Sequence, residues 1–196
     1  MTSTSVSTIP AASRGSLLTA AARRWPALFG AAAGTVFVAG ATTDDTARGL
    51  GETLPLLALI YLVVALLGRR RWTWPVLIAS GPVHLGVLAQ DVVEPPVAYL
   101  GIALVVFLLG AGLGRHRGTG VGLQVAGMAA FTTVALVALA LDPDLGRYVV
   151  AAGWIAHGTW DLIHLRRDRV VSRTYAEWCA VVDVVVGVGL LTAPLL

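Results

Sequence analysis

Long apolar runs alternate with short polar segments along almost the whole chain. Most of these runs are long enough to cross the hydrocarbon core of a bilayer as a helix, which takes about 17–25 residues. The predicted spans are residues 25–41, 53–68, 72–90, 97–113, 121–141, 148–165 and 175–194. The pattern predicts an all-α integral membrane protein, a bundle of seven transmembrane helices that forms one domain over residues 23–196.

The N-terminal region has two interpretations. Residues 1–22 are rich in Ser, Thr and Ala and are expected to form a disordered cytoplasmic tail. Arg23 and Arg24, the apolar run after them and the small residues 39–41 also resemble a cleavable export signal. The bundle would have six helices if this first run were removed.

Composition supports the membrane assignment. Of the 196 residues, 57% are hydrophobic and 13% are charged, whereas soluble domains are about 25% charged. All 14 basic residues are arginines, and they occur in short clusters between the apolar runs. Such clusters are the usual topology signal of membrane proteins, so we expect the lipid bilayer, and no nucleic acid, as a partner.

The charges also predict an orientation. If the N-terminus is cytoplasmic, 12 of the 14 arginines lie in inner segments, and the outer segments hold seven acidic residues. Every connecting segment then obeys the positive-inside rule. The chain is therefore expected in a bacterial-type plasma membrane as a multi-pass protein, with the N-terminus cytoplasmic and the C-terminus outside.

The sixth predicted span carries ionisable residues on one face. His157, Asp161 and His164 follow one another at spacings of four and three residues, which places them on the same side of a helix. Asp183, on the next span, is expected at the depth of His157, and His84 on the third span within about one turn of that level. Because ionisable residues inside a bilayer are costly, they suggest function. We predict His157, Asp161, Asp183 and His84 as catalytic residues.

Further polar and aromatic residues are expected around this site. Gln124 is predicted near the level of Asp161 or His164, so that a polar cavity would lead from the bundle centre towards the cytoplasm. His164 and Gln124 are therefore candidates for substrate binding. Trp154 and Trp160 flank the polar face and either wall the pocket or face lipid. The single cysteine, Cys179, excludes an intramolecular disulfide and is expected to pack as a small apolar residue.

Several kinds of chemistry fit this constellation. An aspartate beside a histidine suits general acid–base catalysis or a proton relay. A divalent metal at His157, Asp161 and His164 is an alternative, and no other cofactor is predicted. In a third interpretation the polar side chains bond only to one another and hold the bundle together.

Residues 150–190 carry a recognisable pattern. Trp154, His157, Gly158, Trp160, Asp161 and His164 are followed by Tyr175, Trp178 and Cys179 and then by Asp183. This segment resembles one in a family of small bacterial polytopic membrane proteins of unknown activity, so the resemblance implies no catalytic roles. In architecture alone, the predicted bundle is similar to the membrane terpene cyclases.

Three function classes follow from the sequence. The first is a membrane protein that binds or acts on an apolar, lipid- or isoprenoid-like small molecule by acid–base chemistry at the His/Asp site. The second is a small proton- or ion-coupled transporter or channel, and the third is a structural membrane subunit without its own chemistry. Whether the protein is an enzyme, and its oligomeric state, are left open.

Overall fold

The computed structural model of the chain describes Thr19 and residues 22–39 and 44–192, and all regular structure in that part is helical. The predicted tail, apart from Thr19 and Ala22, and the outer ends of the first and last predicted spans lie outside the described residues. The α-helices are α2 (Trp25–Ala39), α3 (Asp44–Leu67), α4 (Thr73–Leu88), α5 (Pro95–Gly112), α6 (Val121–Ala140), α7 (Pro143–Arg167) and α8 (Arg173–Thr192), and η1 (Arg70–Trp72) and η2 (Arg115–Arg117) are short 3-10 helices.

Four of these helices, α3, α5, α6 and α8, are long and apolar enough to cross a membrane. α2 has 15 residues and α4 has 16, just below the usual length of a span. α7 has 25 residues and is more polar than these four, although the apolar pattern predicts its residues 148–165 as a span. The all-helical fold is thus confirmed, and four helices of sufficient length and apolarity support the membrane assignment. A count of seven spans goes beyond these four helices.

Two helices begin earlier than the apolar pattern indicates. α3 starts at Asp44 and α7 at Pro143, inside segments that hydropathy assigns to loops. At α7 the local chemistry explains the difference, because Asp142 accepts a hydrogen bond from the backbone N–H of Leu145 at 3.0 Å and Pro143 occupies the first helical turn. Both are typical helix-start signals.

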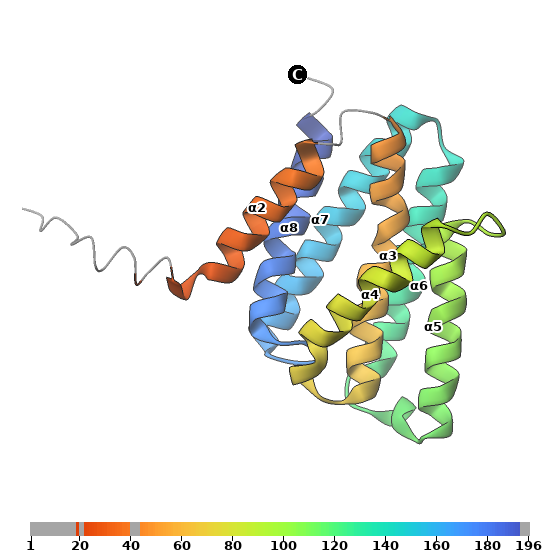
Figure 1. Cartoon of the computed structure of the whole chain (residues 1–196), viewed down its shortest axis with the longest axis vertical. Helices are drawn as coiled ribbons and strands as arrows, with labels where there is room; N and C mark the ends of the chain where they lie inside the picture. Colours follow the sequence, from red (N-terminus) through yellow and green to blue (C-terminus); the bar gives the residue numbers. More distant parts are fainter. Residues whose placement is uncertain (1–18, 20–21, 40–43, 193–196) are drawn as a thin grey trace, which may run out of the picture.

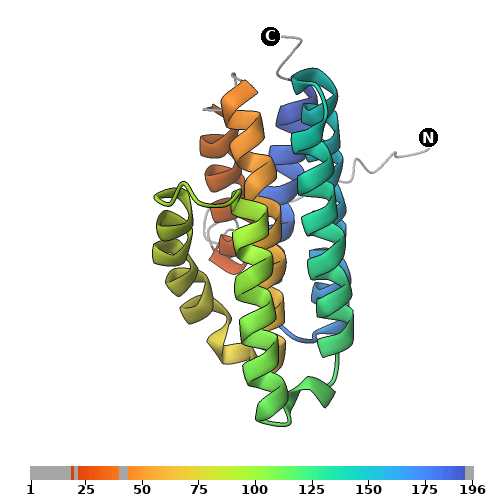
Figure 2. The same cartoon turned by 90° about the vertical axis from the view of Figure 1, so that its right-hand side faces the viewer.

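α3 forms the centre of the bundle and contacts α4, α5, α6 and α7 (Figures 1 and 2). Leu54, Tyr61 and Val64 on this helix have no exposed surface. A helix that is apolar on all sides is buried on all sides. Because of this position, the one polar side chain in the middle of α3, Tyr61, faces other helices rather than lipid.

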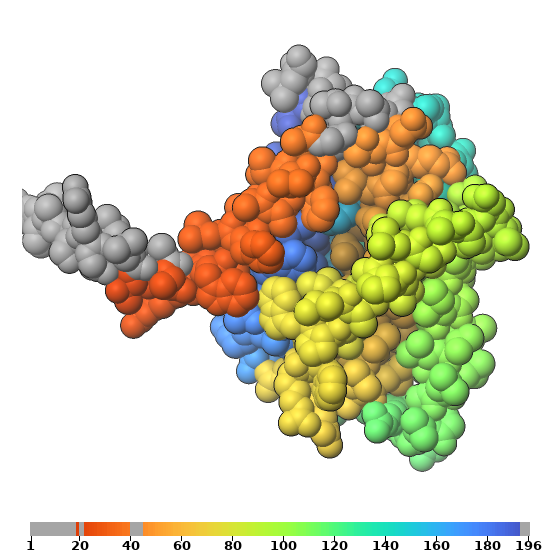
Figure 3. Space-filling model, in the orientation of Figure 1, coloured from red at the N-terminus to blue at the C-terminus, as the bar shows by residue number. Residues whose placement is uncertain are grey.

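α4 crosses α3 obliquely and leads to the N-terminal end of α5 (Figures 1 and 3). Its outer side exposes large apolar side chains, among them Ile78 and Leu85. Pro82 lies inside the helix. α4 is therefore attached to the bundle along one side, unlike α3 and α7, which lie within it.

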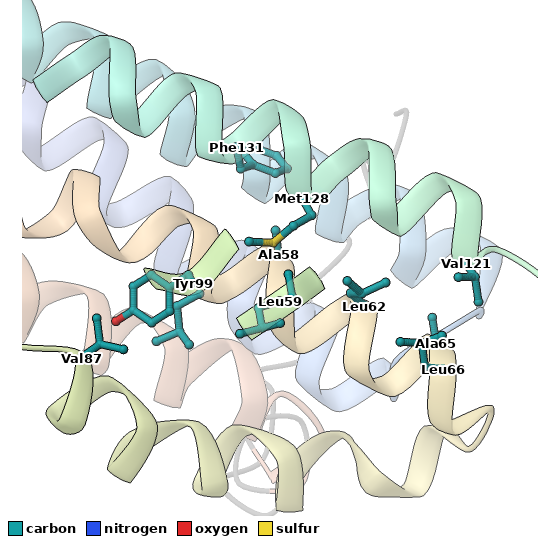
Figure 4. Close-up of a cluster of buried hydrophobic side chains, with 12 residues drawn as sticks. Ala58, Leu59, Leu62, Ala65, Leu66, Val87, Tyr99, Val121, Met128 and Phe131 are labelled. Atoms are coloured by element: carbon teal, nitrogen blue, oxygen red, sulfur yellow. The ribbon is translucent and has the colours of Figure 1, made fainter. Parts of the chain in front are cut away.

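An apolar cluster joins α3, α5 and α6. Leu62 and Leu66 of α3 belong to it together with Val121 and Met128 of α6 (Figure 4). Phe131, at one end of this cluster, extends to the ring of His157 on α7, with ring centroids 4.8 Å apart. Apolar packing thus reaches directly to the polar residues of α7.

Charge divides the two ends of the bundle. One end holds η1, η2 and the α7–α8 connection with most of the arginines, and the other holds the α4–α5 and α6–α7 connections with Asp91, Glu94, Asp142 and Asp144 (Figure 1). The described connecting segments therefore differ in charge between the two ends. Which side faces the cytoplasm stays a prediction.

Candidate functional site

His157 lies between two carboxylates in the middle of the bundle. Its Nδ1 is 2.7 Å from Asp183 Oδ2 on α8 and 3.4 Å from Asp161 Oδ2 one turn further along α7. None of the three side chains has exposed surface. The predicted pairing of His157 with Asp161 and with Asp183 across the α7–α8 hairpin is therefore present.

A glycine lets α7 and α8 approach closely at this point. A Cβ at Gly158 would lie 3.2 Å from Asp183 Cβ and 3.3 Å from the carbonyl oxygen of Ala180. Both distances are shorter than ordinary contacts between packed carbon and oxygen atoms. The absence of a side chain at Gly158 therefore brings Asp183 within hydrogen-bonding distance of His157.

Other polar side chains extend the site. The Tyr61 hydroxyl of α3 donates to Asp161 Oδ1. On α8, Cys179 Sγ lies 3.8 Å from the Tyr175 hydroxyl and 3.9 Å from Asp183 Oδ1, and its single S–H can donate a weak hydrogen bond to one of them at a time. We call the resulting group the interior polar centre, which consists of Tyr61, His157, Asp161, Tyr175, Cys179 and Asp183.

The interior polar centre keeps unused hydrogen-bonding capacity. Among the described residues, neither His157 Nε2 nor Asp161 Oδ2 has a hydrogen-bond partner, although both atoms are buried. Buried polar atoms are normally paired, and an unpaired one needs a specific explanation. The centre can therefore take up a further proton or a cation without displacing an existing partner of these atoms.

Charge balance leads to the same conclusion. Two ionised carboxylates in a dry site are very costly unless they are compensated. An imidazolium at His157 compensates one of them. A second positive charge, either a proton on a carboxyl group or a bound cation, is needed for the other.

His164 belongs to a different environment. Its Nδ1 donates to the Trp160 carbonyl oxygen at 2.9 Å, and its Nε2 is 3.1 Å from Gln124 Nε2, from which it accepts. Both side chains line a cavity of about 500 Å³ at the arginine-rich end, which we call the vestibule. Its lining is Val64, Ala65, Gly68, Arg70, Gly118, Thr119, Gly120, Leu123, Gln124, Ile163, His164, Arg167, Asp168, Arg169 and Val170.

The predicted polar cavity, continuous from the bundle centre towards the cytoplasmic side, is therefore only partly present. The vestibule includes Gln124 and His164, as predicted, but none of the residues of the interior polar centre. The two regions meet at Tyr61, whose ring packs edge-on against His164 with centroids 4.9 Å apart, while its hydroxyl bonds to Asp161. The aromatic ring of Tyr61 thus separates them.

His84 does not join this site. Its Nδ1 lies 2.5 Å from the hydroxyl of Tyr99 on α5, and the two rings are stacked. The prediction that His84 is the third member beside His157 and Asp183 is wrong. It assumes an upright third helix, whereas α4 is oblique and directs His84 towards α5.

The two tryptophans have separate roles. Trp154 is 3% exposed, and its Nε1 donates to the Leu50 carbonyl oxygen at 3.0 Å, so it links α7 to α3 rather than walling a pocket. Trp160 is half-buried and packs against the rings of Phe131 and His164. Trp160 packs against His164, which lines the vestibule, but does not line the vestibule itself.

Three members of the interior polar centre are absent from the sequence-based candidates. Tyr175 begins an apolar run, where tyrosine is common because it lies at the membrane interface. Tyr61 lies in the middle of an apolar run, and its large aromatic ring fits that apolar pattern. Cys179 is expected there as an apolar residue. Its spacing of four residues from both Tyr175 and Asp183 puts all three on one helix face, and this signal could have identified the group.

The interior polar centre could hold a metal ion. His157, Asp161, Cys179 and Asp183 each offer one donor atom, and these atoms lie within 4.8 Å of one another. The predicted metal set contained His164 instead, which is wrong because both ring nitrogens of His164 are already engaged. His157 and His164 are also about 10 Å apart along the helix axis.

Comparisons with models of known protein families, with curated proteins and with solved structures give no match. The function of the site is therefore inferred from its geometry.

Proposed function

We propose that this chain is a polytopic membrane protein that binds an apolar or amphipathic small molecule in the vestibule and acts on it through acid–base chemistry supplied by the interior polar centre. The observation that carries the proposal is the position of His157 Nδ1 between Asp183 Oδ2 and Asp161 Oδ2, at 2.7 and 3.4 Å, in a site without exposed surface.

The seven-span topology is part of this proposal. α6, α7 and α8 alternate in direction between the arginine-rich end and the acidic end, and α4 returns the chain obliquely between α3 and α5 (Figure 1). At 1.5 Å per residue, α7 is about 37 Å long, enough for a bilayer. Its polar side chains are directed into the bundle, where His157 and Asp161 have no exposed surface. A span of this kind keeps its polar side chains away from lipid.

The proposed centre works by holding a variable number of protons. His157 shares a proton with Asp183 over a 2.7 Å hydrogen bond, and the Asp161 carboxyl lies 3.4 Å from the same nitrogen, so the group can act as acid or base. Tyr61 stands between the centre and the vestibule, because its hydroxyl bonds to Asp161 and its ring packs on His164. Its side chain would have to move for the centre to reach a molecule bound in the vestibule. His164 and Gln124 would then contact the bound molecule.

Infrared spectroscopy tests the proton-holding centre directly. Purified full-length protein in nanodiscs should show the C=O stretch of a protonated, buried carboxylic acid at neutral pH. This band should be lost or shifted in Asp161→Asn and in Asp183→Asn, because one of these carboxyls carries the shared proton. Asp144→Asn, the same change at an exposed position, is the control. A spectrum that none of these variants changes would contradict the proposal.

A divalent metal in the same centre is a second candidate. The donor set of one imidazole, one cysteine sulfur and two carboxylates suits zinc. Cys179 would release its proton to bind the ion as a thiolate, so a charge of +2 would compensate two of the three negative charges. Binding would require the His157–Asp183 hydrogen bond to open.

Elemental analysis distinguishes this candidate. Protein incubated with zinc and then dialysed should retain about one ion per chain if the site binds metal, and Cys179→Ser should reduce this content. Ser80→Ala, whose hydroxyl bonds only to the Leu77 carbonyl oxygen, is the control. Equal zinc content in all three proteins would exclude the metal centre.

A further inference from the structure

The rim of the vestibule is positively charged. Three arginines, Arg70, Arg167 and Arg169, and one aspartate, Asp168, line it. Arg70 Nη1 is 2.5 Å from Asp168 Oδ1 and also donates to the Asp168 carbonyl oxygen at 2.7 Å. Arg167 and Arg169 are exposed. The rim therefore has excess positive charge after Asp168 is compensated by Arg70.

A helix N-terminus adds to this charge. The segment Gly118–Thr119–Gly120 lines the vestibule and leads into α6. Gly120 is the N-cap residue, has φ +88° and carries no side chain that could accept from the first-turn N–H groups. The N–H of Val121 already donates to the Gly118 carbonyl oxygen at 3.2 Å. The rest of the first turn has no side-chain cap, and its N–H groups together with the helix dipole favour an anion.

The carbonyl ends of α3 and α7 lie at the same end of the bundle and would oppose an anion. Arginines outside the vestibule lining bond to both of them. Arg115 Nη1 donates to the Leu66 carbonyl oxygen at 3.5 Å and Arg173 Nη1 to that of Leu165 at 3.1 Å. The negative ends of these two helix dipoles are therefore partly offset.

The floor of the vestibule carries an unpaired acceptor. Gln124 is 1% exposed, its Nε2 is engaged with His164, and its Oε1 has no hydrogen-bond partner among the described residues. A buried amide oxygen of this kind is suited to a donor from a bound molecule, such as a hydroxyl group. The unpaired oxygen of Gln124 is an observation separate from the arginines and from the helix N-terminus, and Gln124 lines the same cavity.

The remaining walls are apolar. Val64, Leu123, Ile163 and Val170 line the vestibule beside the charged rim. A small inorganic anion would leave these walls in contact with water. A molecule with an anionic head and an apolar tail would cover both surfaces.

From these observations we propose that the vestibule binds a phosphate-bearing amphiphile, such as a lipid with a phosphomonoester head. Arg167, Arg169 and the N-terminus of α6 contact the phosphate, a headgroup hydroxyl or P–OH donates to Gln124 Oε1, and the tail lies on the apolar walls. Basic pockets between transmembrane helices on the cytoplasmic side are suited to such headgroups. The inference depends on the vestibule being the ligand site, as proposed above.

A binding experiment with three probes tests this inference. Purified full-length protein in a neutral detergent is titrated with dioctanoyl phosphatidic acid, dioctanoylglycerol or inorganic phosphate by calorimetry. Phosphatidic acid should bind at least about tenfold more tightly than either of the other two probes. Arg167→Gln and Arg169→Gln should each weaken its binding about fivefold, since one arginine contributes about 1 kcal/mol to such an interaction. Arg117→Gln is the control at the same end, outside the vestibule lining.

Each alternative result has a separate meaning. Equal binding of dioctanoylglycerol overturns the headgroup assignment and leaves an apolar ligand site. Inorganic phosphate binding as tightly as phosphatidic acid overturns the lipid source in favour of a free anion. Failure of all three probes overturns the inference and also removes the vestibule from the proposed function, while the infrared test of the interior polar centre is unaffected. An equal loss in Arg117→Gln shows attraction to the whole end of the protein and overturns the assigned site.

Discussion

Two histidines on the same helix occupy opposite kinds of environment. His157 lies in the closed interior polar centre between two carboxylates, and His164 lies at the floor of the open vestibule between a neutral amide and a carbonyl oxygen. In the first region charge must be balanced internally, because water has no access. In the second region polar atoms are left available to a ligand. The comparison shows that neighbours and access, rather than residue type, determine the role of each histidine.

Replacing each histidine should give the largest difference between the two regions in the free energy of unfolding. His157→Leu leaves Asp161 and Asp183 without their shared partner in a dry site, and should lower the free energy of unfolding by about 3–5 kcal/mol. His164→Leu loses contacts to neutral groups and should cost about 1 kcal/mol. Unfolding of the purified variants in mixed micelles measures both.

A second variant keeps this prediction testable if His157→Leu does not fold. In His157→Leu/Asp183→Asn one carboxylate is removed together with its partner, so part of the stability should return. Equal losses for His157→Leu and His164→Leu would show that the carboxylates do not depend on the imidazole for charge compensation.

A smaller difference in the free energy of unfolding is expected when a methyl group is added to a glycine in each region. Gly158→Ala introduces a Cβ against Asp183 and Ala180, and should push α8 away from α7 and cost about 1–3 kcal/mol. Gly122→Ala, beside the vestibule, meets no atom within 4 Å and should be neutral or stabilising by up to about 1 kcal/mol. The same unfolding measurement checks both variants. A neutral result for Gly158→Ala would mean that the α7–α8 contact is loose enough to accept the methyl group.

The smallest effect is expected at the vestibule rim. The hydrogen bond from Arg70 lowers the pKa of Asp168 below its ordinary value of 3.8. A carboxyl with a lowered pKa in the folded state stabilises the fold while it is ionised, and this contribution is lost as the pH falls through that lowered pKa. Asp168→Asn should therefore be slightly less stable than the wild type at neutral pH.

The pH dependence of this difference is the measurement. Unfolding of the wild type and of Asp168→Asn should differ at neutral pH and converge in the acid range below the ordinary pKa. Asparagine tolerates the left-handed backbone of this position, where φ is +48°, so strain is not expected to contribute. A difference that stays constant with pH would assign the effect to something other than the Arg70–Asp168 ion pair.

Much of the fold follows from the sequence because hydropathy is a local property. Apolar runs and arginine clusters predict the helices and the division of charge between the two ends. The pairing of His157 with Asp183 is also predictable, since two antiparallel neighbouring helices place equal depths side by side. Hydropathy predicts only residues 148–165 of α7, because the helix begins in a polar segment, and it does not predict the tilt of α4, which depends on the neighbouring helices.

The sequence by itself therefore determined the helical membrane class and a polar site on α7 and α8, because side-chain polarity and helix periodicity act along the chain. Only the tertiary structure decided that Tyr61 and Cys179 belong to that site, that His84 pairs with Tyr99, and that the vestibule ends at His164. These contacts join residues up to about 100 positions apart. They depend on helix tilt and packing. Glycines, which allow close approach, and large side chains, which keep helices apart, determine both in the folded bundle.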